Sequence, residues 1–347
     1  MVILIKVIFS PVLWLLSVIY GIAVKLKYNS SLKNKKYLPK KVICAGNITT
    51  GGTGKSPAVI LLAKMFQEKG RNVAVLSRGY KRKSAGPDLL VVSDKEKLLA
   101  QITESGDEPY LLAESLKGVP VIVCKSRYEA GKYAVENFNA DLLILDDGFS
   151  HWKLHRDLDI VLIDCLKPFG GGFLLPLGRL REPLSCLCRA SVILLTNSGL
   201  VHKEKIDYIT NKIRKYNQFS PIVRAYHKPA GFEKIISREK TAPNGFENKK
   251  AIALSSIGNP LSFEKTLQSL GIDIVDTIRF PDHYWYKESD ITKLSEKKEV
   301  IFTTQKDAVK IEAVMRKMNL TDLNMHFLKI ELEIEEKKTF ENFVFKV

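Results

Sequence analysis

The sequence predicts an α/β protein with a doubly wound, mostly parallel sheet, a second and smaller α/β domain, and an apolar helix at the N-terminus. Three observations support this fold class. Short apolar segments alternate with amphipathic helical segments from residue 40 to about residue 220. One of them, 142–147, is apolar enough to be buried on both faces, as strands of a parallel sheet are. A glycine-rich turn joins the first strand to the helix after it.

The N-terminal helix is predicted from a run without charged residues at 7–24. Eighteen helical residues span about 27 Å at roughly 1.5 Å per residue, close to the bilayer core of about 30 Å. Seven lysines and no acidic residue follow at 25–41. An apolar helix flanked by lysines is typical of proteins held at an anionic membrane surface. We therefore predict a membrane-associating helix at 1–28, with a buried helix followed by a solvated linker as the alternative.

The glycine-rich turn lies within 42–57 and fits the phosphate-binding pattern G-x-x-x-x-G-K-[ST] from Gly51 onward. Thr49 occupies the place of the first glycine. Backbone N–H groups of such a turn converge on a phosphate at the helix N-terminus, while Lys55 supplies positive charge and Ser56 a hydroxyl for Mg²⁺. The fold class is therefore P-loop NTPase-like. The predicted nucleotide-binding residues are Thr49, Thr50, Gly51, Gly52, Thr53, Gly54, Lys55 and Ser56.

The elements after the turn are predicted from apolar patterns and from the residues that bound them. Helix 57–69 has one apolar face and ends at Gly70. Further helices are predicted at 106–116 and 128–137. The predicted strands of this domain are 73–76, 89–92, 121–124, 142–147, 160–164 and 192–196.

A linker is predicted at 221–250, where the pattern weakens and prolines and glycines recur. Beyond it, strands are predicted at 251–255, 272–278, 300–303 and 327–332, and helices at 260–270, 288–297 and 306–318. The expected organisation therefore has four parts: the membrane-associating helix 1–28, a P-loop domain 29–220, the linker 221–250 and a smaller C-terminal α/β domain 251–347.

Two adjacent carboxylates, Asp146 and Asp147, end the apolar strand 142–147. Acids at a strand end can cap a turn, but a P-loop site needs such an acid to orient Mg²⁺, directly or through water. We therefore assign them to the metal. No guanine-binding N-K-x-D or T-K-x-D sequence follows a late strand, so the predicted nucleotide is ATP rather than GTP.

Phosphate transfer to a hydroxyl needs a base or an orienting group. Asp107, which opens a helix, and His283, which lies among aromatic residues, are the two candidates. Taken alone, neither residue is specific, because an acid at the start of a helix is usually a cap and a lone histidine is usually a packing or surface group. The loop 168–183 adds Arg179 and Arg181, which are able to meet phosphate.

The net charge of +16, from 54 basic and 38 acidic side chains, indicates an anionic partner. The lysines concentrate beside the apolar helix and in loops, without the interleaved aromatics of a base-stacking surface, so nucleic acid is disfavoured. Five cysteines have no paired metal spacing, and their odd number disfavours a disulfide framework. We predict reduced thiols in the cytosol.

Seven motifs, in order, together resemble the tetraacyldisaccharide 4'-kinase family. They cover nearly the whole chain, which makes the resemblance far more specific than a P-loop alone. The motifs are Asn-x-x-x-Gly-Gly-x-Gly-Lys-Ser-Pro (47–57), Leu-Ser-Arg-Gly-Tyr (76–80), Gly-Asp-Glu-Pro (106–109), Asp-Asp-Gly-Phe-x-His (146–151), Leu-Pro-x-Gly-x-Leu-Arg-Glu (175–182), Asp-His (282–283) and Thr-x-Lys-Asp-Ala-Val-Lys (304–310).

The resemblance implies transfer of the ATP γ-phosphate to the 4'-hydroxyl of a tetraacylated glucosamine disaccharide 1-phosphate, giving lipid IVA, at the cytoplasmic face of the bacterial inner membrane. It implies that Asp107 is the base and that His283 holds and tunes it. The acids that hold Mg²⁺ in the family correspond to Asp146, Asp147 and Glu108. The chain departs from the usual family pattern at Ser150, where glutamine is usual, and at Gln305, where glutamate is usual.

A second hypothesis is a membrane-associated P-loop ATPase switch without a small-molecule acceptor. It predicts ATP hydrolysis stimulated by lipid or by a protein partner, and no phosphorylated lipid product.

Overall fold

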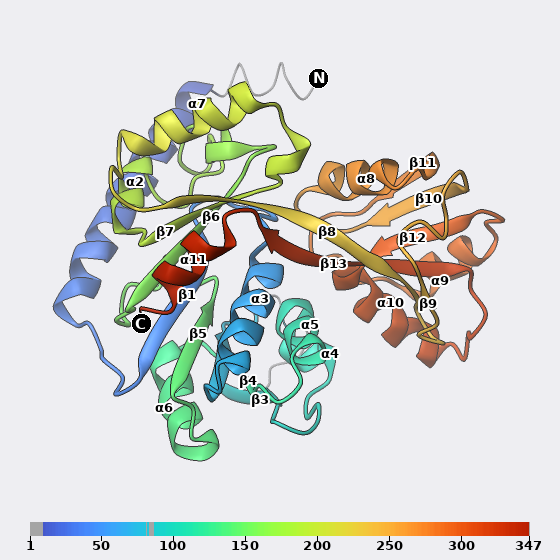
Figure 1. Cartoon of the computed structure of the whole chain (residues 1–347), viewed down its shortest axis with the longest axis horizontal. Coiled ribbons are helices and arrows are strands. Elements are labelled where there is room, and N and C mark those ends of the chain that lie inside the picture. The colour runs from blue at the N-terminus through green and yellow to red at the C-terminus, as the bar shows by residue number, and fades with distance from the viewer. Residues whose placement is uncertain (1–9, 81, 83–86, 347) are drawn as a thin grey trace. The chain divides into compact units, whose positions relative to one another are not determined.

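The structure is a computed structural model that describes residues 10–80, 82 and 87–346 (Figure 1). The chain forms two compact units, which are interleaved in sequence. Of the described residues, the first unit comprises those up to Lys55, together with 127–226 and 334–346, and the second comprises those of 56–126 and 227–333. The predicted domain boundaries at 28, 220 and 250 stay predictions.

The first unit contains a parallel sheet in the order β5-β1-β6-β7-β8. Apart from Lys41, β1 is buried along its length, and β5, β6 and β7 are wholly buried, because apolar side chains alternate to both faces. The α/β fold class with a mostly parallel sheet is therefore confirmed. The strands are β1 (Lys41–Asn47), β5 (Leu142–Asp146), β6 (Leu158–Asp164), β7 (Val192–Thr196) and β8 (Ile222–Lys234), of which only 222–226 belong to the first unit. The helices are α2 (Ser10–Lys33), α6 (Arg127–Phe138), α7 (Lys203–Arg214) and α11 (Lys337–Val344), with short 3-10 turns at Pro168–Gly171, Leu184–Arg189 and Ser198–Leu200.

The second unit contains two sets of strands. β4 pairs in parallel with β2 and antiparallel with β3, and the order β11-β10-β12-β13 is parallel throughout. The first set and its helices are α3 (Lys55–Glu68), β2 (Val73–Ser77), β3 (Leu89–Ser93), α4 (Ile102–Ser105), α5 (Asp107–Ser115) and β4 (Val121–Cys124). The second set is β9 (Lys240–Thr241), β10 (Lys250–Ser255), α8 (Pro260–Ser269), β11 (Asp273–Arg279), α9 (Glu288–Ser295), β12 (Val300–Thr304), α10 (Gln305–Lys317) and β13 (Met325–Ile334).

Alternation along β10 builds a core on each face of the second set. Ile252 and Leu254 belong to one apolar cluster, while Ala251 and Ala253 belong to the other. Successive side chains of a strand point to opposite faces, so a single run of apolar residues supplies both cores. This arrangement fixes the carboxyl ends of β10 and β12, from which the buried polar residues of the site emerge.

The range predicted as a linker, 221–250, contains the 13-residue strand β8. The strand pairs with β7 through Ile222 and its neighbours, and with β9 through Phe232 and Glu233. Pro229 lies between these two paired stretches, where a missing N–H does not interrupt either ladder. Pro229 and Gly231, two of the residues that suggested irregular chain, are therefore accommodated within a strand.

Helix α2 extends to Lys33, five residues beyond the predicted end at 28. Residues 1–9 of the predicted helix lie outside the described part of the chain. Tyr28 packs edge-on against Trp152, with ring centroids 5.5 Å apart, and Ser31 is buried, which explains the longer helix. Among the described residues, this is the one helix long and apolar enough to cross a membrane, by length and composition. Most of its large apolar side chains are exposed, for example Trp14 at 56% and Leu26 at 64%.

Candidate active site

The glycine-rich turn has the strand–turn–helix context that the motif requires. β1 ends at Asn47 and α3 begins at Lys55. Gly51 and Gly54 have φ of 111° and 84°, a region that favours glycine. Thr49, at the place of the first glycine, forms an isolated antiparallel bridge with Leu180. The turn therefore joins β1 to the N-terminus of α3 as a phosphate-binding turn does.

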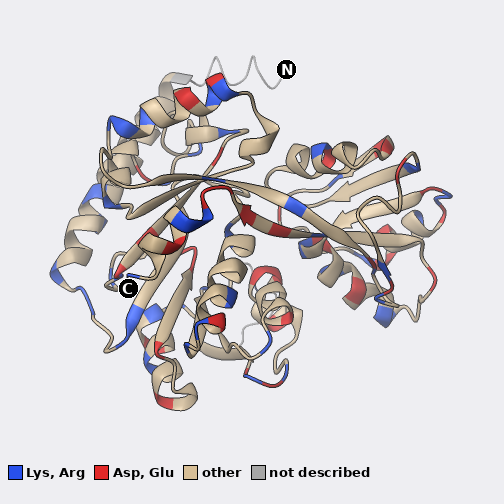
Figure 2. Cartoon of the chain, viewed as in Figure 1, with Lys and Arg blue, Asp and Glu red and all other residues tan. Residues whose placement is uncertain are grey.

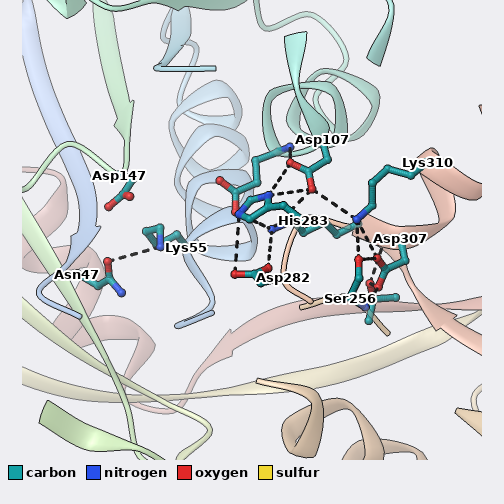
Figure 3. Close-up of polar contacts among 12 residues, drawn as sticks. Asn47, Lys55, Asp107, Asp147, Ser256, Asp282, His283, Asp307 and Lys310 are labelled. Atoms are coloured by element: carbon teal, nitrogen blue, oxygen red, sulfur yellow. Dashed lines mark hydrogen bonds and ion pairs between the residues drawn. The ribbon is translucent and has the colours of Figure 1, made fainter. Parts of the chain in front are cut away.

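Lys55 and the strand-terminal acids lie in the first unit (Figure 3). Lys55 Nζ is 3.5 Å from Asn47 Oδ1. Asp146 ends β5 and is buried, and Asp147 follows in the left-handed region with φ of 51°. Burial by itself raises the pKa of the Asp147 carboxyl, but the charges of Lys55 and Arg181 outweigh burial and hold that pKa well below its ordinary value. Asp147 is therefore ionised at neutral pH.

Arg181 is the main partner of Asp147. Its Nη2 is 2.6 Å from Asp147 Oδ1 and its Nη1 is 2.8 Å from Oδ2, so the pair is bidentate. Nη2 also donates to the backbone oxygen of Asn47 at 2.7 Å and to its side-chain oxygen. The arginine expected to meet phosphate therefore bonds to a predicted metal ligand and to the residue that precedes the turn.

Asp107 and His283, which lie far apart in the sequence, are in contact within the second unit (Figure 3). Asp107 is the first residue of α5 and is 3% exposed. His283 Nδ1 lies 3.0 Å from both Asp107 Oδ1 and Oδ2. His283 has φ of 63°, and such strained backbone concentrates at functional sites. The structure thus brings the two candidate residues together as a hydrogen-bonded pair.

Lys306, near the start of α10, determines which nitrogen of His283 carries the proton. Its Nζ lies 3.3 Å from His283 Nε2 and 3.0 Å from Glu108 Oε1. An ammonium group only donates, so Nε2 accepts, and the proton resides on Nδ1 and is donated to Asp107. Burial lowers the pKa of Lys306, but the carboxylates of Glu108, Asp107 and Asp282 outweigh burial and raise it above the ordinary value.

A second lysine, Lys310, is wholly buried beside Asp107 (Figure 3). Its Nζ lies 2.7 Å from Ser256 Oγ, 3.0 Å from Asp307 Oδ1 and 3.6 Å from Asp107 Oδ2. Asp307 also accepts hydrogen bonds from Thr304 Oγ1 at 2.8 Å and from the backbone N–H of Ser256 at 2.9 Å. The network anchors the ammonium beside the dyad.

These contacts set the charge of Asp107. Burial by itself raises the pKa of its carboxyl, but the hydrogen bond from His283 and the charges of Lys306 and Lys310 outweigh burial. The pKa of Asp107 is held well below its ordinary value. The carboxylate is therefore ionised throughout the physiological range.

The predicted metal ligands lie on three elements. Ser56 is the second residue of α3, Asp146 ends β5 and is followed by Asp147, and Glu108 is the second residue of α5 and is ion-paired with Lys306. Among the described residues there is no preformed group of three or more His, Cys, Asp or Glu side chains that could hold a metal. Two carboxylates and a hydroxyl are nonetheless hard oxygen donors of the kind that Mg²⁺ prefers.

Ser150 and Gln305, the two departures from the family pattern, each form a hydrogen bond with another segment of the chain. Ser150 Oγ donates to Glu182 Oε1 at 2.6 Å, and Glu182 Oε2 accepts from Arg189. The side-chain oxygen of Gln305 accepts a hydrogen bond from the backbone N–H of Ile330 at 3.3 Å. Both side chains are thus engaged in holding neighbouring segments.

Sequence reasoning left Lys306, Asp307 and Lys310 without roles, although they lie in a motif it singled out. Residues three and four apart share one face of a helix, so a helix at 306–318 places Lys306 and Lys310 on the same face. The partner on which they converge, Asp107, is remote in sequence. The spacing therefore predicted that the two lysines lie on one face of the helix, but it did not predict that this face contacts Asp107.

Comparison with known proteins gives the family. Residues 9–347 match the family described as Tetraacyldisaccharide-1-P 4'-kinase. The chain is 40% identical to tetraacyldisaccharide 4'-kinase of Halothermothrix orenii, over 93% of this chain and 90% of that protein. It is 38% identical to the enzyme of the same name from Syntrophus aciditrophicus, over 98% and 93%. The crystal structure of LpxK from Aquifex aeolicus in complex with ATP superposes with a TM-score of 0.75 at 31% identity, over 99% of each chain. The chain belongs to the tetraacyldisaccharide-1-P 4'-kinase family.

Proposed function

We propose that this protein transfers the γ-phosphate of ATP to the 4'-hydroxyl of tetraacyldisaccharide 1-phosphate and so forms lipid IVA. Family membership across residues 9–347 supports this reaction. The observation that carries it in the structure is the contact of His283 with Asp107 at 3.0 Å, in a chain that also has a P-loop. A kinase needs a group that takes the proton of an acceptor hydroxyl, and a buried carboxylate held by a histidine fits that task.

In this proposal, residues 49–56 bind ATP. The relative from Aquifex aeolicus has been crystallised in complex with ATP. The backbone N–H groups of the turn contact the phosphates, and the ammonium of Lys55 contacts the phosphate that is transferred. Asp107 accepts the proton of the 4'-hydroxyl, and His283 holds the carboxylate through its Nδ1–H.

The low pKa of Asp107 is compatible with a role as base. Phosphoryl transfer in most analyses passes through a loose transition state with little bond formation to the attacking oxygen. The hydroxyl proton therefore becomes acidic only as the new P–O bond forms, and a weakly basic carboxylate can take it at that stage. Because its pKa is low, the Asp107 carboxyl is ionised, and so able to accept a proton, at neutral pH.

We also propose that Ser56, Asp146 and Asp147 hold Mg²⁺, and that Glu108 joins them only if its ion pair with Lys306 opens. Mg²⁺ held by these residues would supply positive charge that neutralises the charge developing on the transferred phosphate. Asp147 is ionised, as a ligand of Mg²⁺ must be, because Lys55 and Arg181 lower its pKa. The predicted organisation into a kinase domain, 29–220, and a smaller domain, 251–347, is kept as part of this proposal.

A transfer assay tests the proposed function directly. Wild-type protein is incubated with labelled ATP and tetraacyldisaccharide 1-phosphate in detergent micelles, and the position of phosphate on the product is mapped. We expect a product phosphorylated at the 4'-position. Release of inorganic phosphate stimulated by lipid, with no phosphorylated lipid, would instead establish the ATPase switch.

We propose that α2 holds the protein at the cytoplasmic face of the inner membrane. Its exposed apolar side chains meet the acyl region, and the lysines of 25–41 meet anionic headgroups (Figure 2). Each lysine near an anionic surface contributes about 1 kcal/mol, and this attraction weakens with salt. Apolar and basic contributions together give stable association where either alone is marginal.

Replacing Trp14, Ile19 and Ile22 by serine is expected to lower vesicle binding at least about tenfold, because each buried apolar side chain contributes roughly 1.5–3 kcal/mol. All three are more than half exposed, at 56%, 54% and 56%, so folding is expected to be retained. The measurement is co-sedimentation with vesicles that contain phosphatidylglycerol. A variant with Phe219 and Val275 changed to serine, exposed at 92% and 46%, is the control and is expected to bind as wild type. Equal binding by both variants would exclude α2 as the membrane contact.

A further inference from the structure

One edge of the apolar helix α2 is hydrogen-bonded to the loop 174–181, which we call the arginine loop. Ser17 is 6% exposed, although apolar neighbours on the helix are largely exposed. Its Oγ donates to the backbone oxygen of Leu174 at 2.9 Å and accepts from the N–H of Leu177 at 3.1 Å. The hydroxyl of Tyr20 donates to the backbone oxygen of Arg181 at 3.1 Å. These two polar side chains therefore tie both ends of the loop to the helix.

The helix also approaches this loop closely at Gly21. A Cβ built at Gly21 would lie 2.9 Å from Leu174 Cδ1, closer than real contacts allow. A larger residue would require the end of the Leu174 side chain to shift away from the helix. The sequence thus provides two hydroxyls and a glycine on the one edge of α2 that faces the loop.

The far end of the arginine loop is hydrogen-bonded to the nucleotide-binding turn. The N–H of Thr50 donates to the backbone oxygen of Arg179 at 2.8 Å, and the N–H of Arg181 donates to that of Ile48 at 2.7 Å. Thr49 and Leu180 form the bridge between these two bonds. The loop is therefore a short strand partner for the first half of the turn.

The Arg181 side chain adds a second connection to the same site. It bonds Asp147 through both guanidinium Nη atoms, and it bonds Asn47, whose side-chain oxygen is also 3.5 Å from Lys55 Nζ. Because Arg181 contacts residues on β1 and after β5, its position affects the two strand ends that frame the turn. All of these contacts lie within the first unit.

We propose that Ser17 and Tyr20 are positioning residues for ATP, acting through the arginine loop on the nucleotide-binding turn. The apolar helix then has two separable roles: its exposed face meets the membrane, and its inner edge holds the ATP site in its binding geometry. This inference rests on the proposed function only in its assignment of residues 49–56 to ATP. A turn that is held in one conformation before ATP binds has less conformational freedom to lose, and its affinity is correspondingly higher.

The test is the double variant Ser17→Ala, Tyr20→Phe, which removes three hydrogen bonds and no apolar surface. Equilibrium dialysis of the full-length protein in detergent with labelled ATP and Mg²⁺ gives the dissociation constant. We expect ATP binding to weaken about 5- to 30-fold, in keeping with the usual worth of one or two net hydrogen bonds. KM for ATP is expected to rise in parallel, with KM for the acceptor and vesicle binding unchanged.

Tyr208→Phe is the matched control, since Tyr208 lies on α7 in the same unit, is 55% exposed and accepts a hydrogen bond from Lys212. It is expected to bind ATP as wild type does. Tyr20→Phe alone, expected to lose part of the affinity, serves if the double variant does not fold. ATP affinity equal to wild type in the folded double variant would overturn the inference. Wild-type protein that binds ATP but phosphorylates no disaccharide would overturn the proposed function and leave this inference standing.

Discussion

Replacing Asp107 by asparagine is expected to lower kcat for phosphate transfer by about 10²–10⁴-fold, the usual contribution of a positioned general base. Asparagine is close to aspartate in size, and its oxygen can still accept the hydrogen bond from His283 Nδ1. It cannot accept a proton from a hydroxyl. KM for ATP is expected to change little, because residues 49–56 bind the nucleotide in our proposal. Steady-state kinetics with the disaccharide acceptor in micelles measure both quantities.

Loss of a buried carboxylate could also lower activity by loosening the fold, and a matched variant separates the two effects. Glu264 is 8% exposed and forms a bidentate pair with Arg279, at 2.7 and 2.6 Å, in the same unit as Asp107. Glu264→Gln is expected to lower stability and to retain kcat. If a folded Asp107→Asn protein also retains kcat, Asp107 does not serve as the base.

Much of the fold could be predicted because its signals are local. The run 142–147 was predicted as a buried parallel strand and is β5, Leu142–Asp146, since apolar side chains on both faces fit few other structures. Helix α10, Gln305–Lys317, lies within one residue of its predicted bounds for a similar reason, as its apolar residues follow the helical period. Strand β8 was missed because Pro229 and Gly231 argue locally for a break. Where a proline meets the ladder depends on the partners of the strand, which the local sequence does not contain.

In the candidate site, too, the residues of contiguous motifs could be predicted from the sequence, whereas the contacts between distant residues could not. The nucleotide-binding turn is contiguous, so its residues and their order were readable directly. Asp107 and His283 were each ambiguous in isolation, and the resemblance to a family, rather than any spacing, predicted that they pair. Arg181, which the sequence marked as able to meet phosphate, bonds Asp147 and Asn47, because the loop that carries it packs against the turn. Such contacts follow from tertiary packing and have no local signature.

Lys310 is the clearest case of a residue whose role the sequence concealed. A lysine on an amphipathic helix ordinarily faces water. Here it is wholly buried, because three groups meet its charge: Asp307 on the same helix, and Ser256 and Asp107 from two other segments. The ammonium and the two carboxylates are thus taken out of water together, and each is tolerated only through the others.

Replacing Lys310 by methionine is therefore expected to destabilise the protein by about 3–5 kcal/mol, the usual effect of removing one partner of a buried ion pair. Methionine fills a similar volume, so the main loss is charge: Asp307 and Asp107 stay buried without the ammonium 3.0 and 3.6 Å away. Since a domain of this size loses about 2–4 °C in Tm per kcal/mol, thermal unfolding is expected to shift down by roughly 6–20 °C. Calorimetry or circular dichroism measures the shift.

Lys317→Met on the same helix provides the comparison, because Lys317 is 76% exposed and pairs with Glu288 at 2.7 Å. The same chemical change at an exposed pair is expected to alter stability by no more than about 1 kcal/mol, since water solvates the carboxylate that remains. The difference between the two variants thus isolates burial from the loss of a lysine. A Tm for Lys310→Met as high as that for Lys317→Met would mean that the carboxylates around Lys310 do not depend on its charge.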